Sequence, residues 1–511
     1  MKQSWKHRLT AAALAVGMLL TLPACGKQEQ FLSERAVELT AQFEPVSTAK
    51  VAPLTQEQAA LLTDFGLRLM EHCAQEGQSI LVSPVSVLTA LGMTVNGGAS
   101  ETLTEMESVL GMKRHDLNQA LSAYWSGLPE SEKTTLRAAN SLWVTNRGNF
   151  TVNSDFLQTC TDFYDADIFQ TAMDAAACQE INQWVKAQTD GMIPELLDRL
   201  SPDAVMVLVN ALAFHGLWEE PYEARQIREG VFLTGTGAPV TTELMYSEEA
   251  MYLENDVATG VVKPYKGGKY AFVGLLPKEN RSPAELIRQL DGQSLQELLN
   301  DREDVAVQTI IPKYETTTTL ELVDILRAMG MPLAFDATRA DFSDLGFSDA
   351  DNLFLSRVLH QTFLSLTEEG TKAAAATAVE VADGAALMED FREVFLDQPF
   401  VYLLVDTETW VPFFIGTMTD PTGNTTTVSP DTPPMQVQVQ GKLYQSTGRH
   451  SELDGRCGIM DGEIIASVDR SASPVQDDQS NFGTGWGYQR MSDTTIEVNL
   501  GRHWIVFEQL K

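Results

Sequence analysis

Residues 368–381 read Glu-Glu-Gly-Thr-Lys-Ala-Ala-Ala-Ala-Thr-Ala-Val-Glu-Val, and this stretch decides how the chain is interpreted. Alanine is the strongest helix former, so a surface helix is one interpretation. However, Gly370 interrupts its start, and the apolar residues do not recur at the i, i+3, i+4 spacing of an amphipathic helix. Thr377, Val379 and Val381 alternate as the residues of a strand do. The stretch therefore favours an extended segment of small side chains.

The same stretch resembles the reactive-loop hinge of the serpin family, whose pattern is roughly E-E-G-T-E-A-A-A-A-T. In that family a protease cuts an exposed loop, and the hinge then inserts as a new strand in the middle of a preformed sheet. The resemblance implies that Thr371 enters first. Alternate residues share a face of a strand, so the next core-facing positions would be Ala373, Ala375 and Thr377. Lys372 stands where the family usually has Glu, and it would face outward. The implied hinge residues are Glu368, Gly370, Thr371, Ala373, Ala374, Ala375, Ala376 and Thr377.

Length and charge limit the classes of function. The chain has 511 residues, enough for more than one domain, and 44% of them are hydrophobic, so a large core can form. The formal net charge of −34 argues against nucleic-acid binding by phosphate neutralisation, and it favours solubility.

The N-terminus has the features of a targeting segment. Basic residues precede the apolar run 9–22, which is too short to prefer spanning a membrane as a mature helix. Residues 22–25 (Leu-Pro-Ala-Cys) resemble a bacterial lipobox, which would make Cys25 the lipidated first residue of the mature protein. Ordinary secretion with cleavage nearby is the alternative. We expect a signal peptide at 1–24 and a tether at 25–55, with the protein held on the outer face of a bacterial membrane.

The remaining cysteines give no sign of a metal site. Cys73, Cys160, Cys178 and Cys457 show no C-x-x-C spacing, so we expect no zinc, no cofactor, and either buried thiols or at most one disulfide. The chain also has no nucleophile-elbow, zincin or P-loop pattern, which disfavours the hypothesis of an enzyme.

Residues 80–93 predict a short strand followed by a buried helix, with Ser83 as the cap and Pro84 in the first turn. This run resembles the serpin segment beneath the central sheet, where serine hydroxyls hydrogen-bond an asparagine and a histidine at the point where the sheet must part. For each such residue alone, an ordinary satisfied core position is the alternative. The residues that match this "shutter" are Ser83, Ser86, Asn210 and His360.

Residues 205–218 form a near-continuous apolar run, as expected of a strand buried on both faces. Trp218 matches the family's tryptophan at the "breach", where the hinge first enters. The resemblance covers residues 56–421 and implies an α+β serpin fold with three β-sheets, about nine helices and an exposed reactive-centre loop. Other matching segments, in family order, are 136–144, a helix across the sheet with the turn that follows it (181–185 and 189–193), 261–277, 310–314, 326–343 and 399–421.

A Pro-rich linker at 422–434 leads to residues 435–511, for which we predict a small β-rich domain of unknown function. Its strands are expected at 435–441, 464–465, 494–500 and 504–507. His450 and His503 are expected at its surface. Three aromatic residues could bind a glycan or peptide, although core packing is favoured; these are Trp486, Tyr488 and Trp504.

The family pattern also indicates the bond that a protease would cut. Counting from Gly370 puts the acyl-side residue at Gly384 and the leaving side at Ala385. The loop is a few residues longer than in a typical member, so every bond up to Met388–Glu389 stays open. The alternatives Ala386, Leu387 and Met388 suit small or medium apolar pockets, as in elastase-, subtilisin- or chymotrypsin-like serine proteases. No basic residue precedes Arg392, so a trypsin-like target is not expected.

The resemblance thus implies a monomeric, non-enzymatic inhibitor that traps a target serine protease as a covalent acyl complex. The attacking serine belongs to the protease, and loop insertion distorts the protease before water can deacylate it. The native fold would be held by kinetic barriers. A non-inhibitory serpin acting as a surface binding module is the alternative, and the small side chains of the hinge disfavour it.

Overall fold

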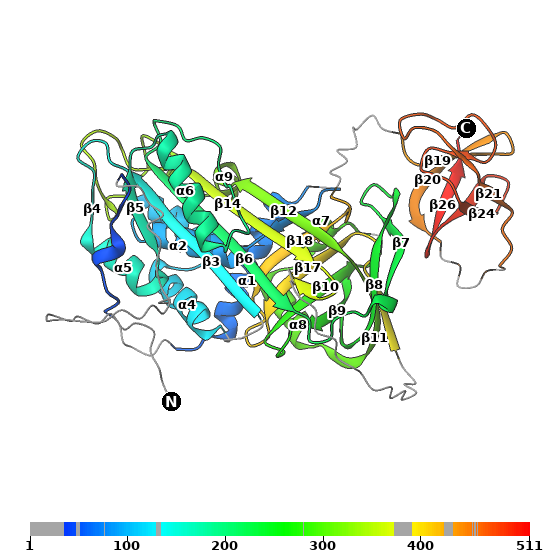
Figure 1. Ribbon diagram of the computed structural model, residues 1–511, viewed down its shortest axis with the longest axis horizontal. Coiled ribbons are helices and arrows are strands. Elements are labelled where there is room, and N and C mark those ends of the chain that lie inside the picture. The colour runs from blue at the N-terminus through cyan, green and yellow to red at the C-terminus, as the bar shows by residue number, and fades with distance from the viewer. Residues whose placement is uncertain are drawn as a thin grey trace, which may run out of the picture.

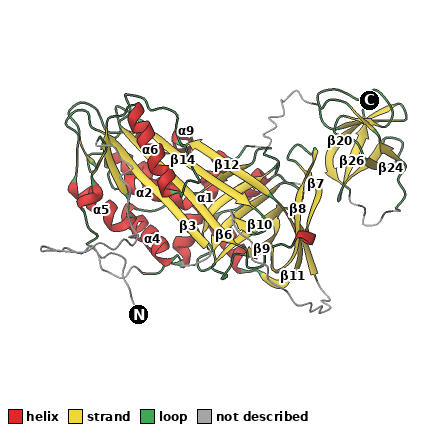
Figure 2. Cartoon of the chain, viewed as in Figure 1, coloured by secondary structure: helices red, strands yellow, loops and turns green. Residues whose placement is uncertain are grey.

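The computed structural model describes residues 35–46, 52–75, 77–128, 134–279, 281–371, 391–423, 433–451, 453, 456 and 458–510. These residues form nine α-helices and four sheets, one of which belongs to the C-terminal domain (Figures 1 and 2). The three sheets and nine helices of the described residues before 424 confirm the expected α+β fold.

A seven-stranded sheet forms the centre of the larger domain. Its strands, in spatial order, are β1 (Val37–Glu38), β5 (Asp167–Thr171), β3 (Thr134–Thr145), β6 (Met206–Leu217), β15 (Gly370–Thr371), β14 (Leu355–Leu366) and β12 (Tyr314–Glu321). The strands β6 and β14 are parallel and pair directly over most of their length, from Met206 opposite Leu355 to Ala213 opposite Phe363. We call the end at which β6 stops at Leu217 and β14 stops at Leu366 the hinge end.

The second large sheet has nine strands. Its path is β16 (Phe391–Phe395), β11 (Glu303–Pro312), β8 (Pro239–Glu254), β9 (Ala258–Pro264), β10 (Tyr270–Pro277), β17 (Phe400–Asp406), β18 (Pro412–Met418) and β2 (Ile80–Val82), with β7 (Ile227–Leu233) paired to β8. A third sheet consists of β4 (Thr151–Val152) and β13 (Gly346–Phe347).

Helices cover both faces of the central sheet. Along β6, Met206 and Leu208 face the core that contains α2 (Pro84–Val95), whereas Val207 and Val209 face the core that contains α6 (Ala175–Gln188). Figure 1 shows α6 lying across β3 and β6. Because alternate residues of a strand point to opposite faces, this double cover explains the continuous apolar run of β6. The other helices are α1 (Gln56–Cys73), α3 (Ser100–Leu110), α4 (Arg114–Gly127), α5 (Ser154–Tyr164), α7 (Pro283–Gln289), α8 (Gly292–Asn300) and α9 (Val323–Met329).

Residues 35–46, in the middle of the expected tether, are folded onto the domain, so this part of the tether prediction is wrong. The strand β1 pairs with β5, and the Leu39 N–H donates a hydrogen bond to the Ile168 carbonyl at 2.7 Å. Leu39 and Phe43 also pack against the main core. Two apolar residues in so short a segment leave no periodic pattern, so the sequence did not reveal this docking.

The C-terminal domain is a single sheet around its own core, as expected. Its strands, in spatial order, are β21 (Gly462–Ile464), β24 (Trp486–Arg490), β25 (Thr495–Leu500), β26 (His503–Gln509), β20 (Lys442–His450), β19 (Gln436–Val439), β23 (Gln479–Ser480) and β22 (Ala466–Ser467). Tyr488 lies in the core, Trp486 packs against it, and the Arg456 guanidinium covers Trp504 at 4.0 Å from the ring centroid. The prediction that His503 is a surface residue is wrong, because it is only 8% exposed and faces the larger domain.

Candidate functional site

The start of the predicted hinge, Gly370 and Thr371, lies between two strands of the central sheet. Thr371 pairs with Gly216 on β6 and with Leu366 on β14, so β15 separates these strands at the hinge end. Beyond β15, from Ala213 and Phe363 onward, β6 and β14 pair with each other. The sheet is therefore open by one short strand and closed along the rest of its length.

Gly370 makes this entry possible. Its φ of +145° is a backbone conformation that other residues rarely adopt, and a Cβ atom there would lie 2.1 Å from the Gly216 carbonyl oxygen. The backbone turns just before it: the Thr367 N–H donates to the Gly370 carbonyl at 2.8 Å. A side chain at position 370 would thus exclude the hinge from the sheet.

Thr371 is the first inserted side chain, and it is fully buried. Its hydroxyl lies 2.6 Å from the hydroxyl of Tyr265. The Tyr265 ring stacks on Trp218, with centroids 4.4 Å apart. Burial raises the pKa of Tyr265, so its hydroxyl keeps its proton and can donate or accept a hydrogen bond here.

Trp218 holds the chain that precedes the hinge. Its backbone N–H donates to the Glu369 carbonyl at 2.9 Å, and its indole N–H donates to the Thr367 carbonyl at 2.9 Å. Lys313 pairs with the Glu368 carboxylate at 2.9 Å, and this hydrogen bond lowers the pKa of Glu368. The predicted breach residue and the start of the predicted hinge are therefore in direct contact.

A buried ion pair supports this aromatic site. The Lys263 ammonium lies 2.6 Å from the Glu249 carboxylate, and the two side chains are only 2% and 9% exposed. The same ammonium lies 5.4 Å from the Trp218 ring centroid and 4.5 Å from that of Tyr222. Sequence analysis missed Glu249 and Tyr222. The signal for Lys263 was its place in an apolar strand, where a lysine is rarely buried without a partner.

The four predicted shutter residues meet beneath the sheet. The Asn210 amide donates to the Ser86 carbonyl at 2.8 Å and also contacts the Ser86 hydroxyl. The Ser83 backbone N–H donates to Nε2 of His360 at 3.0 Å. Since Nε2 accepts, the imidazole proton is on Nδ1, which donates to Oδ1 of Asn210 at 2.5 Å. Burial lowers the pKa of His360 to about 3, so the ring is neutral.

Two details of the shutter differ from the prediction. The Ser83 hydroxyl neither caps α2 nor hydrogen-bonds any described residue; Ser83 acts through its backbone N–H. Asn140 joins the group, because the Asn210 amide donates to its Oδ1 at 2.5 Å. Asn140, Asn210 and His360 are register partners on β3, β6 and β14, so they form a polar row across three strands.

Several predicted residues lie outside the part that the structure describes. They are Cys25, Cys457, the hinge residues Ala373, Ala374, Ala375, Ala376 and Thr377, and the candidate bond residues Gly384, Ala385, Ala386, Leu387 and Met388. The other three cysteines (Cys73, Cys160 and Cys178) are free and buried, as expected, and burial raises the pKa of Cys73 to about 12. Among the described residues, no group of three or more His, Cys, Asp or Glu side chains could hold a metal ion. None of the described helices is long and apolar enough to span a membrane.

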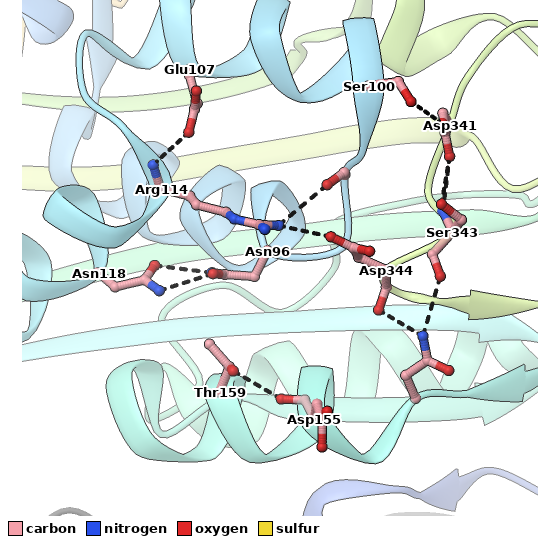
Figure 3. Close-up of polar contacts among 12 residues, drawn as sticks. Asn96, Ser100, Glu107, Arg114, Asn118, Asp155, Thr159, Asp341, Ser343 and Asp344 are labelled. Atoms are coloured by element: carbon pink, nitrogen blue, oxygen red, sulfur yellow. Dashed lines mark hydrogen bonds and ion pairs between the residues drawn. The ribbon is translucent and has the colours of Figure 1, made fainter.

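A separate polar cluster joins α3 and α4 to residues 341–344 (Figure 3). The hydroxyls of Ser100 and Ser343 both donate to the Asp341 carboxylate, at 2.7 and 2.8 Å, and these bonds lower the pKa of Asp341. A carboxylate with a lowered pKa is a poor general base. Arg114 pairs with Asp344 at 2.9 Å. The cluster fits a structural role in joining these elements and gives no support to an enzyme.

Comparison with known proteins identifies the larger domain. The family model described as Serpin (serine protease inhibitor) matches residues 60–421. An uncharacterised serpin-like protein of Thermococcus kodakarensis is 31% identical over 70% of this chain and 85% of its own length. Leukocyte elastase inhibitor A of Mus musculus is 30% identical over 70% of this chain and 98% of its own length.

Solved structures agree with this assignment. The thermophilic serpin tengpin in its native state is 38% identical, with a TM-score of 0.72 over 76% of this chain and 100% of tengpin. Its latent state gives a TM-score of 0.64 over 73% of this chain and 100% of tengpin. Serpins are typically protease inhibitors rather than enzymes, and they generally act outside cells. Since the family model and these relatives match one continuous domain, in which Gly370 and Thr371 lie between β6 and β14, the chain belongs to the serpin family.

Proposed function

We propose that this serpin irreversibly inhibits an extracellular serine protease by reactive-loop cleavage and insertion. The observation that carries the proposal is the position of Thr371, which is already paired with β6 and β14 while these strands remain paired beyond it. The protease serine would attack the carbonyl of the bait residue to form an ester, and the amine of the next residue would leave. The freed hinge would then add a full strand to the sheet.

The register of β15 indicates where the inserted residues would go. Thr371 lies opposite Gly216 and Leu366. Moving the same number of residues along all three strands brings Thr377 opposite Asn210 and His360. Insertion would then part these two shutter residues and put a small hydroxyl side chain between them. The small hinge residues suit this path, because a bulky or charged side chain would be costly to bury.

We propose Gly384–Ala385 as the bait bond, with the following bonds up to Met388–Glu389 as alternatives. These residues are small or apolar, which supports a protease with an elastase-, subtilisin- or chymotrypsin-like pocket. One relative carries the name leukocyte elastase inhibitor, in keeping with such a target. We further propose that a lipid on Cys25 holds the protein at a bacterial cell surface.

The test uses the soluble chain lacking residues 1–25. It is mixed separately with pancreatic elastase, subtilisin, chymotrypsin and trypsin, and the products are followed by denaturing gels and mass spectrometry of the released fragment. We expect an SDS-resistant complex with at least one of the first three proteases and none with trypsin. The new N-terminus of the fragment identifies the bait bond.

Clean cleavage by all four proteases without any complex would contradict inhibition of these classes. The alternative, a non-inhibitory surface module, would then be tested by melting the cleaved chain. A sharply raised melting temperature would show that the loop still inserts, whereas unchanged melting would contradict a metastable native state.

A further inference from the structure

The C-terminal domain contacts the segment that directly follows the reactive loop. The Arg502 guanidinium lies 3.7 Å from the centroid of the Phe395 ring, at the end of β16. Arg502 and His503 lie 3.6 and 3.2 Å from the Asp397 carboxylate, which is only 1% exposed. Within the described part of the chain, these two residues are the only ion-pair partners of Asp397. The Asp397 carboxylate makes no hydrogen bond to any described residue, so Arg502, whose charge is permanent, supplies the electrostatic stabilisation that a buried carboxylate needs.

A second contact fixes the domain beside β7, as Figure 1 shows. Leu233, the last residue of β7, lies in the same apolar core as Met435 and the other core residues of the C-terminal domain. The Leu233 N–H also donates to the Asp397 carbonyl at 2.9 Å. Gly501 approaches so closely that a Cβ atom there would lie 3.0 Å from Cβ of Val231. The domain is therefore packed onto the serpin and is joined to it by more than the linker.

The strand β16 is vulnerable without such support. It is an edge strand that pairs only with β11 among the described strands, and its first three residues are exposed. Its hold on β11 includes the Leu396 N–H, which donates to the Ile310 carbonyl at 2.8 Å. Edge strands paired on one side are the elements that peel away most easily.

Insertion of an uncut loop would pull on β16. In the register of β15, residue 381 would lie opposite Met206. Residue 381 is ten residues beyond Thr371, so the inserted strand would be about 33 Å long at roughly 3.3 Å per residue. Residues 382–390 would have to return to Phe391, and this length of chain reaches at most about 36 Å. The returning chain must also cover the sideways distance from the central sheet to β16, so its maximum reach barely exceeds the distance along the sheet alone. Insertion without cleavage therefore requires β16 to leave β11.

We propose that the C-terminal domain is a latch on β16, with Arg502 and His503 holding Asp397 so that the uncut loop cannot insert. The latch opposes only insertion of the uncut loop, which would use up the inhibitor without trapping a protease. Cleavage separates the hinge from β16, so a cleaved loop can insert while β16 stays in place. This inference rests on the proposed insertion mechanism. It assigns a role to residues 433–510, which the serpin mechanism does not otherwise use.

The test compares Arg502→Glu with Arg490→Glu in the soluble chain. Arg490 is an exposed arginine of the same domain whose side chain contacts Gln440, so its variant has the same change in net charge. Hydrogen exchange measures the amides of residues 391–397. Conversion is measured by incubating the uncut chain and then heating it, because a chain whose loop has inserted stays folded at a temperature that unfolds the native form. For Arg502→Glu we expect both exchange and conversion to be roughly tenfold faster, because the reversed charge repels Asp397. For Arg490→Glu we expect no change.

Asp397→Asn gives a second test that leaves the C-terminal sequence intact, in case Arg502→Glu does not fold. It removes the attraction from the serpin side, and we expect the same direction of change. The latch is overturned if folded variants exchange and convert at the rate of Arg490→Glu, or if exchange rises while conversion does not. Neither measurement needs a protease, so failure of the latch is distinguishable from failure of the inhibitor to trap its target.

Discussion

The Thr371 and Tyr265 hydroxyls lie 2.6 Å apart in the interior of the molecule, and they join the first inserted hinge residue to the aromatic pair of Tyr265 and Trp218. Thr371 belongs to the loop, whereas Tyr265 follows a strand of the other large sheet. The contact therefore links the position of the loop to both large sheets. The insertion that we propose would therefore extend an opening that already exists.

Replacing Tyr265 by phenylalanine should loosen the hinge without disturbing the ring stack. The variant loses one buried hydrogen bond, worth about 1 kcal/mol, so we expect the amides of Gly370 and Thr371 to exchange roughly five times faster. Tyr124→Phe is the control, because the Tyr124 hydroxyl is buried and has no hydrogen-bond partner among the described residues. Equal exchange in the two variants would contradict a role for the Tyr265 hydroxyl.

Under the proposed mechanism, Thr371→Arg should make the protein a substrate that the protease cleaves without being trapped. Position 371 is fully buried, and a guanidinium cannot enter there without losing its hydration. We expect the ratio of cleaved chain to trapped protease to rise by roughly tenfold or more. Lys372→Glu is the control. Neighbouring residues of a strand point to opposite faces, so an inserted residue 372 would point away from the site of Thr371, and this variant should trap protease as the parent does. Full trapping by Thr371→Arg would contradict the insertion mechanism.

Acid should weaken the shutter through His360. Burial lowers the pKa of His360 to about 3, whereas the unfolded chain has the ordinary value near 6.5. Between these values the unfolded chain binds a proton that the native state does not. The stabilisation is therefore complete above about pH 6.5 and falls as the pH falls toward 3, with about 2 kcal/mol lost at pH 5.

The measurement is the urea midpoint of the first unfolding transition at about pH 7.5 and pH 5 for the parent and for His360→Gln. Glutamine can accept the Ser83 N–H but does not titrate. His450, whose pKa is lowered by burial, and Asp167, whose pKa burial raises to about 6, are present in both proteins. The urea midpoint of the parent should thus fall more between about pH 7.5 and pH 5 than that of His360→Gln. Equal decreases in the two midpoints would rule out His360 as the titrating group.

The Lys263–Glu249 pair should be strongly coupled. Lys263→Leu leaves a buried carboxylate without its cation, which should cost about 3–5 kcal/mol of unfolding free energy. Adding Glu249→Leu removes both charges and should restore most of this loss. Lys278→Leu is the control: its pair with Glu254 is also 2.6 Å long, but Glu254 is 45% exposed, so the loss should be under about 1 kcal/mol. Equal losses in the two single variants would contradict a special role for the buried pair.

The sequence predicted the parts of this molecule that follow from local pattern or family spacing. The doubly covered β6 followed from its continuous apolar run. The place of Trp218 beside the start of the hinge and the meeting of Asn210 with His360 were implied by the resemblance to serpins. What it could not supply were partners distant in sequence. Glu249 is an ordinary acidic residue in the chain, and only the fold brings it to Lys263.

The remaining differences also have physical causes. His503 was expected at the surface, but it is 8% exposed and lies 3.2 Å from Asp397 of the larger domain, a partner that is distant in sequence. The Ser83 hydroxyl was expected to bond, but the backbone geometry at the start of α2 presents the N–H instead. Docking between domains and the choice between a hydroxyl and a backbone donor depend on three-dimensional geometry, which residue type alone does not determine.

The shutter bonds have a further consequence for how the sheet can part. Ser83 and Ser86 both belong to the start of α2; one donates to His360 on β14, and the other accepts from Asn210 on β6. The two strands and the helix thus form a closed circuit of hydrogen bonds. If β6 and β14 separate, each can stay tied to the helix, and within this circuit only the His360–Asn210 link must break. Parting the strands must also break the backbone pairing of β6 with β14, so the side-chain circuit adds one further bond to break at this level, while α2 offers a hydrogen-bond partner to each strand.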